Sequence, residues 1–172
     1  MHAAAKDAGV SVTSYLIAAV ICAVRTTMTA RDRRRAIHLD VPVDLRSLFG
    51  SATLRNFFGL AFITYTPGDA DAPLADVAAE VQRQLTAGCE PASLKRRMMS
   101  MIKLEKNPLL RLAPLFAKDF ILGLANRLAA RDVTTTMSNL GPIRIDERLA
   151  LYIRDVNILT STTGLNFLMC AF

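Results

Sequence analysis

The stretch "AIHLDVPVDLR", residues 36–46, alternates apolar and polar side chains and is rich in β-branched residues. An alternation with a period of two places one set of side chains on each face of a strand, so we predict a strand over 36–46. A second strand-like run, "NFFGLAFITYTP" over 56–67, is closed by Pro67 and Gly68. The intervening "SLFGSATL" (47–54) is predicted to be a loop with a glycine.

Helices are predicted on both sides of these strands. Residues 2–8 and 12–29 contain helix-forming and apolar residues separated by Gly9, and Ser11 is a suitable N-cap for the second helix. Residues 73–88 form an amphipathic pattern that begins with a proline suited to a first helical turn. Its apolar positions at helical spacing are Leu74, Val77, Ala78, Val81 and Leu85.

Residues 92–131 are predicted to be helical, with interruptions at Pro108 and Pro114. The segment carries nine Lys or Arg against two acidic residues. This pattern is compatible with an anionic membrane surface, and equally with core helices flanked by long cationic side chains. We favour the core interpretation because the prolines interrupt any continuous amphipathic face.

The last third of the chain returns to strands, predicted over 133–138, 151–162 and 165–172. The fold class is therefore α/β (α+β), a mixed and largely antiparallel sheet flanked by helices, in a single domain over 1–172. An unpaired apolar strand at the end of a chain invites aggregation. Either the last strand pairs internally or the sequence is a fragment.

Composition excludes several classes of function. Hydrophobic residues make up 52% of the chain, which favours a packed core. The net charge of +6 would suit nucleic acid, but Trp is absent and the aromatic residues do not alternate with basic ones as a stacking platform requires. We therefore expect no nucleic-acid partner, whereas a phosphate-bearing cofactor fits the charge.

The cysteines and histidines indicate neither a disulfide framework nor a metal site. Cys22, Cys89 and Cys170 are far apart, without a CxxC pair, and are expected to be reduced thiols. The chain has two histidines, which makes an imidazole-based metal site improbable. No signal peptide is visible and "YLIAAVICAV" (15–24) is too short to span a bilayer, so we expect a cytoplasmic protein.

Common catalytic motifs are absent from the sequence, including GxSxG, the P-loop, GxGxxG and HExxH. His38 lies in the first predicted strand, with Asp40 two residues later on the same face. Without a nucleophile that can be placed beside it, a structural role for His38 is favoured over a catalytic one.

Four stretches, in this order, carry a resemblance to a known superfamily: "AKDAGVSVTSYLIAAVICAVR" (5–25), "VPVDLRSLFG" (41–50), "LRNFFGLAF" (54–62) and "TTTMSNLGPI" (134–143). Together they resemble the second half of chloramphenicol-acetyltransferase-like proteins. These include alcohol O-acetyltransferases, polyketide-associated acyltransferases and peptide-synthetase condensation domains. The resemblance implies one lobe of a two-lobed fold, with a tunnel between the lobes for an acyl thioester and an alcohol or amine acceptor.

The catalytic signature of the superfamily, HHxxxDG, belongs to the first half and is absent here. Its second histidine acts as the general base on the acceptor, a task that suits imidazole because its pKa lies near neutrality. The resemblance therefore implies a C-terminal lobe without the N-terminal lobe and the extreme C-terminus. Alone, this lobe would be inactive and would have no catalytic residue of its own. The family reaction would use acetyl-CoA or another acyl-CoA as co-substrate, and no cofactor would be bound covalently.

Site residues follow from the same resemblance. The strand with Thr136 and Ser138 would line the tunnel, and Ser138 and Asn139 would offer hydrogen bonds beside the thioester carbonyl. Alternatively, Asn139 and Gly141 simply form the turn after the strand. Asn56 and Gly59 are candidates for the tunnel wall, or for a cap and a turn.

Arg46 is expected to form a structural ion pair, buried against Asp44 or against a residue of the other lobe. Partners expected for the whole chain are the missing lobe, or a second copy through an apolar face, and a small-molecule acceptor. We expect no membrane contact. A non-catalytic α/β interaction module, or a degenerate relative of the acyltransferases, remains the alternative.

Overall fold

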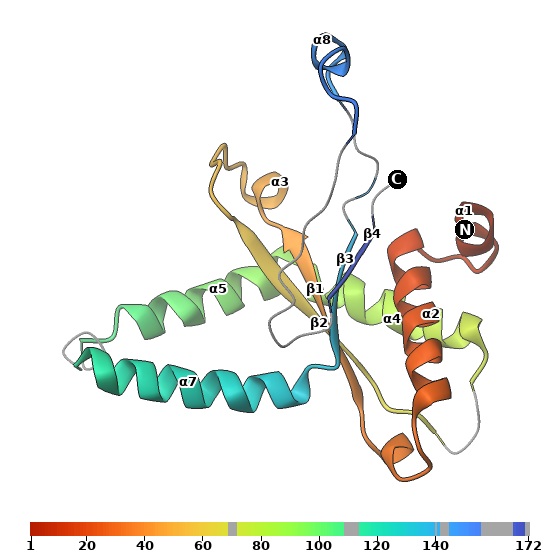
Figure 1. Ribbon diagram of the computed structural model, residues 1–172, viewed down its shortest axis with the longest axis horizontal. Helices are drawn as coiled ribbons and strands as arrows, with labels where there is room; N and C mark the ends of the chain where they lie inside the picture. Colours follow the sequence, from red (N-terminus) through yellow and green to blue (C-terminus); the bar gives the residue numbers. More distant parts are fainter. Residues whose placement is uncertain (69–71, 109–113, 140, 142–144, 156–166, 171–172) are drawn as a thin grey trace.

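The computed structural model describes residues 1–172 except 69–71, 109–113, 140, 142–144, 156–166 and 171–172. Its four-stranded sheet has the order β2-β1-β3-β4 (Figure 1). The longest pairing, between β1 and β2, is antiparallel, whereas β3 pairs in parallel with both β1 and β4. The predicted mixed sheet is confirmed. The strands are β1 (Ile37–Asp44), β2 (Phe58–Tyr65), β3 (Thr135–Asn139) and β4 (Phe167–Cys170).

The helices before and after the β1–β2 pair agree with the prediction, including the cap at Ser11. Its side-chain oxygen accepts a hydrogen bond from the Ser14 amide at 3.1 Å. The loop between the strands begins with one short helix, which ends at Gly50 in the left-handed conformation (φ 61°). The helices are α1 (His2–Asp7), α2 (Val12–Thr27), the 3-10 helix η1 (Asp32–Arg34), α3 (Arg46–Phe49), α4 (Leu74–Gly88), α5 (Pro91–Glu105), α7 (Leu115–Asp132) and α8 (Glu147–Ala150).

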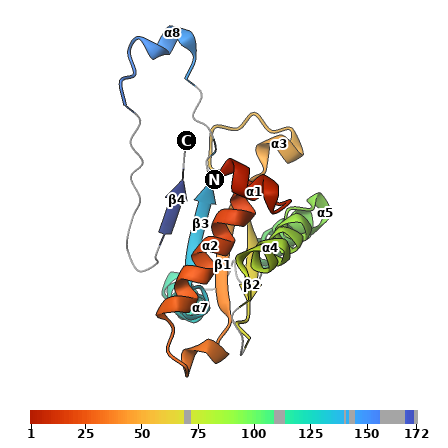
Figure 2. The same cartoon turned by 90° about the vertical axis from the view of Figure 1, so that its right-hand side faces the viewer.

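The core lies between one face of the sheet and helices α2 and α4 (Figure 2). Alternation along β1 directs Ile37, Leu39 and Val41 into this core, where each is at most 4% exposed. Removal of this apolar surface from water is the main stabilising contribution to the fold. The remaining core residues are Ile17, Ala18, Ile21, Ala61, Ile63, Val77, Ala78, Val81 and Met137.

Two side chains protect β2, an outer strand of the described sheet. The Gln84 amide donates to the Thr64 carbonyl and accepts from the Thr64 N–H, both at 2.9 Å. Arg97 donates to the Leu60 carbonyl at 2.8 Å. Because these bonds occupy backbone groups of the strand edge, they oppose pairing with another chain.

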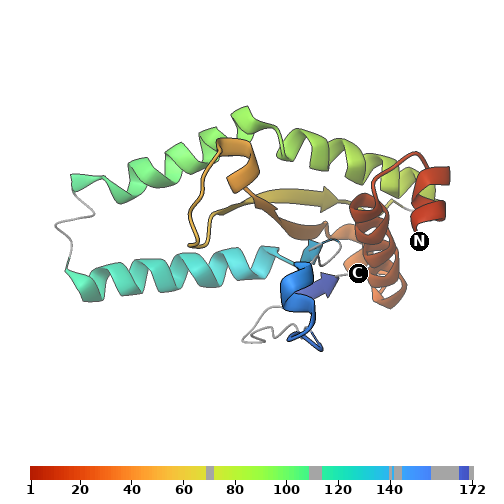
Figure 3. The ribbon, with the colours of Figure 1, turned by 90° about the horizontal axis from the view of Figure 1, so that it is seen from above.

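Helices α5 and α7 extend away from the sheet on the side opposite α2 (Figures 1 and 3). The predicted core packing of 92–131 is wrong for most of its described residues. Leu94 is buried, but the large apolar side chains beyond it are exposed because the described core between the sheet, α2 and α4 does not extend to them. These residues, 43–77% exposed, are Met99, Met101, Leu104, Leu115, Phe116, Phe120, Ile121, Leu122 and Leu124.

The C-terminal predictions have mixed outcomes. Residues 151–155, the described part of the predicted strand 151–162, form a turn and irregular backbone instead. Asp146 caps α8 by accepting from the Arg148 amide, and the amides of Tyr152 and Ile153 bond back to the Leu149 carbonyl. The last strand is confirmed over 167–170, where it pairs with β3. The other residues of these two predictions lie outside the described ones.

Candidate functional site

Strand β3 carries the predicted tunnel residues and lies between β1 and β4. Met137 points into the core beneath α2, so the alternation directs Thr136 and Ser138 to the opposite face. Both are only 9% exposed, and Thr136 lies in register with Asp40 of β1. The structure therefore places these two hydroxyl groups together on the sheet face that points away from the core.

Asn139 ends β3 and already uses both ends of its amide. Its Nδ2 donates to Thr13 Oγ1 of α2, and its Oδ1 accepts from the Gly141 amide, both at 2.9 Å. Gly141 has a φ of 67°, which glycine adopts without strain. This geometry supports the turn alternative for Asn139 and adds a tie to α2. A role beside a thioester stays a prediction.

Asn56 and Gly59 do not join Ser138. Asn56 is exposed in the loop before β2. Gly59 belongs to the alternate set of β2 residues that faces the helices, where an added Cβ would lie 3.1 Å from the Leu94 side chain and 3.4 Å from that of Leu45. The absent side chain lets α5 approach the sheet closely, and nothing in this packing assigns Gly59 to a tunnel.

Arg46 forms the predicted ion pair with Asp44, with 2.9 Å between Nη1 and Oδ1. The pair is not buried as expected, since the two side chains are 38% and 55% exposed at the end of β1. The guanidinium also donates to the carbonyls of Thr53 and Arg55 at 3.0 and 2.7 Å. Its structural role is to hold the β1–β2 loop, and an exposed pair of this kind contributes only about 0–1 kcal/mol.

The face of the β1–β2 pair that points away from the core carries a polar group at one end. His38 Nδ1 lies 3.1 Å from Thr64 Oγ1, and Asp40 lies two residues farther along the same face. They line a cavity of about 300 Å³ together with Phe62 and Val133. Burial raises the pKa of the Asp40 carboxyl, and the charge of His38 partly opposes this.

Replacement of Asp40 by asparagine tests this burial. A raised folded-state pKa means that the associated stability is present below the ordinary value of 3.8 and is lost as the pH rises through the folded-state value. Asp40→Asn removes that loss, so its stability relative to wild type should rise from pH 3 to pH 7. Urea unfolding at both pH values measures the difference. An unchanged stability difference between Asp40→Asn and wild type at the two pH values would contradict the raised pKa of Asp40.

Comparison with known proteins shows the family of the chain. Residues 1–145 match the family model described as phthiocerol/phthiodiolone dimycocerosyl transferase C-terminus. The chain belongs to this family. The match supports a C-terminal half of a chloramphenicol-acetyltransferase-like acyltransferase, as the sequence resemblance implied. It does not support the narrower resemblance to alcohol acetyltransferases. No curated protein and no solved structure matched the chain.

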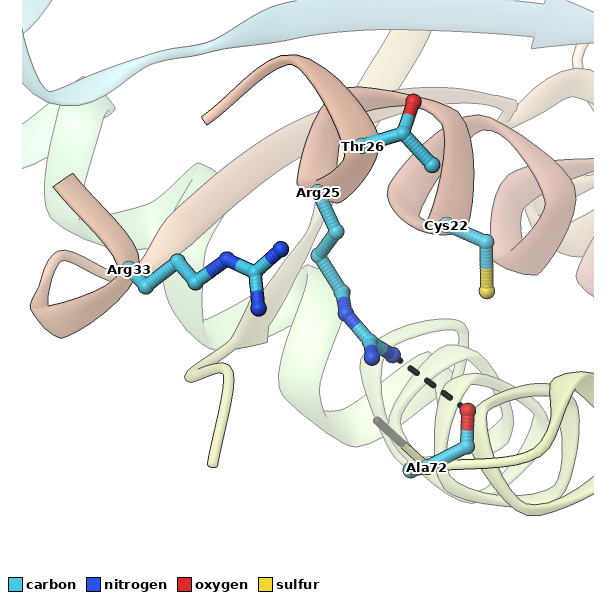
Figure 4. A pocket seen from close by; sticks show the side chains of 5 residues that line it. All are labelled: Cys22, Arg25, Thr26, Arg33 and Ala72. Atoms are coloured by element: carbon cyan, nitrogen blue, oxygen red, sulfur yellow. Dashed lines mark hydrogen bonds between the residues drawn. The ribbon is translucent and has the colours of Figure 1, made fainter. Parts of the chain in front are cut away.

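The described part of the chain also contains a small cavity of about 170 Å³ that the sequence did not reveal (Figure 4). The guanidinium groups of Arg25 and Arg33 both point into it. Arg25 is 7% exposed, donates to the Ala72 carbonyl at 3.4 Å and lies 6.0 Å from the centre of the Tyr65 ring. One sequence signal could have indicated its burial, because Ile17, Ile21 and Arg25 follow each other at intervals of four on α2.

Metal and thiol chemistry have little support among the described residues. No group of three or more His, Cys, Asp or Glu could hold a metal ion there, and no described helix is long and apolar enough to cross a membrane. Cys22 and Cys89 are free thiols. Burial raises the pKa of the Cys89 thiol, opposed by the charge of Arg97, so this thiol is a poor nucleophile near neutral pH.

Proposed function

We propose that this chain is the C-terminal lobe of a cytoplasmic acyltransferase that transfers an acyl group from acyl-CoA, or from a carrier thioester, to an alcohol or amine. The observation that carries this proposal is the family match over residues 1–145, which includes β1, β2, β3 and helices α1 to α5 and α7. The family name describes a transferase of mycocerosyl groups. Acyl transfer is the part of that description that we extend to this chain.

The proposed reaction needs a base that this lobe does not provide. The acceptor oxygen or nitrogen attacks the thioester carbonyl carbon, the carbon–sulfur bond breaks, and the acceptor proton finally resides on the released thiol. Neither histidine of the chain belongs to an HHxxxDG sequence, and His38 Nδ1 is engaged with Thr64. The lobe therefore supplies walls and substrate contacts, and the base comes from an N-terminal lobe.

The exposed apolar residues of α5 and α7 favour such a partner. Monomeric soluble proteins rarely leave large contiguous apolar patches in water, and α7 exposes large apolar side chains around much of its circumference. Self-association is the second way to cover them, although two basic copies repel each other through this surface. Part of the positive charge would serve the phosphates of coenzyme A, and nucleic acid is not part of the proposal.

A reconstitution assay tests the proposed function. The chain is studied alone and together with an N-terminal lobe of a family member that carries HHxxxDG, with thiol release from acetyl-CoA and decanoyl-CoA as the readout and 1-decanol as acceptor. The chain alone should give the uncatalysed rate, and light scattering measures whether it covers the exposed apolar residues of α5 and α7 by self-association. The complex should bind CoA in calorimetry and accelerate transfer at least about 100-fold, a gain that alanine at the second signature histidine abolishes.

The contrary result is equally defined. If the two lobes form a stable complex that neither binds CoA nor transfers an acyl group, the acyltransferase proposal fails. A chain that remains a monomer and is indifferent to both CoA and the lobe is instead a non-catalytic module.

A further inference from the structure

Helix α7 exposes a broad apolar side to water. Phe116, Phe120 and Leu124 follow each other at intervals of four, so they share one side of the helix, and they are 77%, 73% and 50% exposed. Ile121, which is 54% exposed, lies beside Leu124 on the same side. A helical side with two phenylalanines and two large aliphatic residues is typical of a helix that lies at the boundary between water and an apolar phase.

The end of α5 farthest from the sheet adds to this apolar surface. It lies at the same end of the molecule as the start of α7, and both helices project from the body that contains α2 (Figures 1 and 3). Met101 and Leu104 of α5 are 72% and 62% exposed, and Leu115 at the start of α7 is 72% exposed. A flat surface can therefore reach these residues without contact with the sheet or α2.

The positive charge of the chain is concentrated in the same segment. Residues 92–131 carry nine Lys or Arg against two acidic residues, whereas the rest of the chain carries twelve against thirteen. The whole net charge of +6 therefore originates from this segment. Three of its basic residues that the structure shows as exposed are Lys103, Lys106 and Arg127. Basic side chains beside an apolar helix strengthen its binding to anionic lipids.

Charge and apolarity together favour a bilayer over other partners. Two copies of so basic a surface repel each other, and nucleic acid would match the charge but leave the phenylalanines in water. An N-terminal lobe suits the side of α5 where Arg97 lies 5.0 Å from the centre of the Phe62 ring, because that side borders the open face of the sheet. It does not require the side of α7 with Phe116. The expectation of no membrane contact depended on core packing of 92–131, which is wrong for most of its described residues.

We propose that α7 and the end of α5 bind the surface of an anionic bilayer, with Phe116, Phe120 and Leu124 among the acyl chains and basic side chains at the lipid phosphates. The helices lie in the plane of the interface, since no described helix is long and apolar enough to cross a membrane. The 18 residues of α7 extend about 27 Å along that plane. The alkyl stems of lysine and arginine let their charges reach the phosphates while the phenylalanine rings stay in the apolar layer. This binding does not depend on the proposed function.

A single introduced tryptophan locates the contact, because the chain has no tryptophan of its own. Phe120→Trp is titrated with phosphatidylcholine vesicles that contain about one-third phosphatidylglycerol. Its fluorescence should shift saturably to shorter wavelength and be quenched by lipids brominated on the acyl chain. Leu54→Trp, in the exposed loop before β2, is the matched control and should show neither effect. Pure phosphatidylcholine vesicles should bind at least about tenfold more weakly, and added salt should reduce binding to the anionic vesicles.

Flotation of further variants with the same vesicles separates the basic from the apolar contribution. The double variant Lys103→Gln and Lys106→Gln should bind about tenfold more weakly, whereas Lys6→Gln, in α1 at the opposite end of the molecule, should bind like wild type (Figure 1). The double variant Phe116→Ser and Leu124→Ser should also bind at least about tenfold more weakly. Both of its positions are exposed, so the fold should be retained.

Several results would overturn the proposal. These are no flotation of the wild-type chain with anionic vesicles, equal affinity for neutral and anionic vesicles, or equal responses of Phe120→Trp and Leu54→Trp. Wild-type flotation decides the first two even if a variant does not fold. In the reconstituted two-lobe protein, Phe120→Trp should still shift only when vesicles are added. Short-wavelength emission without vesicles would show that protein covers this side of α7 and would refute the proposal. None of these readouts measures acyl transfer, so their failure leaves the proposed function standing.

Discussion

Replacement of Leu39 by alanine should lower the free energy of unfolding by about 3–4 kcal/mol, within the range for fully buried leucines. Leu39 is 0% exposed in the central part of the sheet. It lies opposite Ile63 of β2 and beside Thr135 of β3, and it belongs to the core formed with α2 and α4. Because three sides of the site belong to regular elements, the surroundings cannot collapse to fill the cavity.

Urea unfolding of wild type and variant at pH 7 measures this loss. Leu54→Ala is the matched control, because Leu54 is fully exposed in the loop before β2 and loses the same atoms on substitution. We expect the control to change stability by less than about 0.5 kcal/mol. Equal losses at the two positions would show that Leu39 is not part of the cooperative core.

Asn139→Ala should lower the free energy of unfolding by about 2–3 kcal/mol. It leaves the hydroxyl of Thr13 and the amide of Gly141 without their partner, and each loss is worth about 1 kcal/mol or more at a partly buried site. Asn139→Asp keeps the acceptor for Gly141 and should cost less. Thr13→Val removes only the bond to α2 and should cost about 1 kcal/mol.

A double-mutant cycle of Thr13→Val and Asn139→Ala isolates the tie between α2 and β3. Chemical unfolding should give a coupling energy of about 0.5–1 kcal/mol. A coupling near zero would contradict the contact. If the role of Asn139 is purely structural, Asn139→Ala lowers the activity of the reconstituted protein only in proportion to the loss of folded protein. A larger loss of activity supports the predicted contact of Asn139 with the thioester.

Local patterns predicted most of the elements because their causes are local. The alternation over 36–46 became β1, and the apolar spacing over 73–88 became α4, since strand and helix periodicities are properties of consecutive residues. Ser11 was recognised as a cap because a capping side chain bonds to an amide only three residues away.

Predictions that depended on distant partners were less successful. The apolar content of 115–124 shows that these residues favour burial, but no local pattern says which surface buries them, and the core interpretation was wrong for most of the described residues. The run at 151–155 looks like a strand by composition. A capped turn that begins at Asp146 prevails, because the Asp146 side chain accepts from the Arg148 amide and the Leu149 carbonyl accepts from the amides of Tyr152 and Ile153.

The sequence by itself determined the order and type of most elements, the absence of HHxxxDG and membership of the dimycocerosyl transferase C-terminal family. Only the tertiary structure decided that Asn139 bonds to Thr13, 126 positions away, and that Gly59 makes room for Leu94. It also decided that Asp40, His38 and Thr64 share one open face. Such contacts arise from strand register and helix packing, which depend on free energies summed over the whole core, and no window of neighbouring residues contains them.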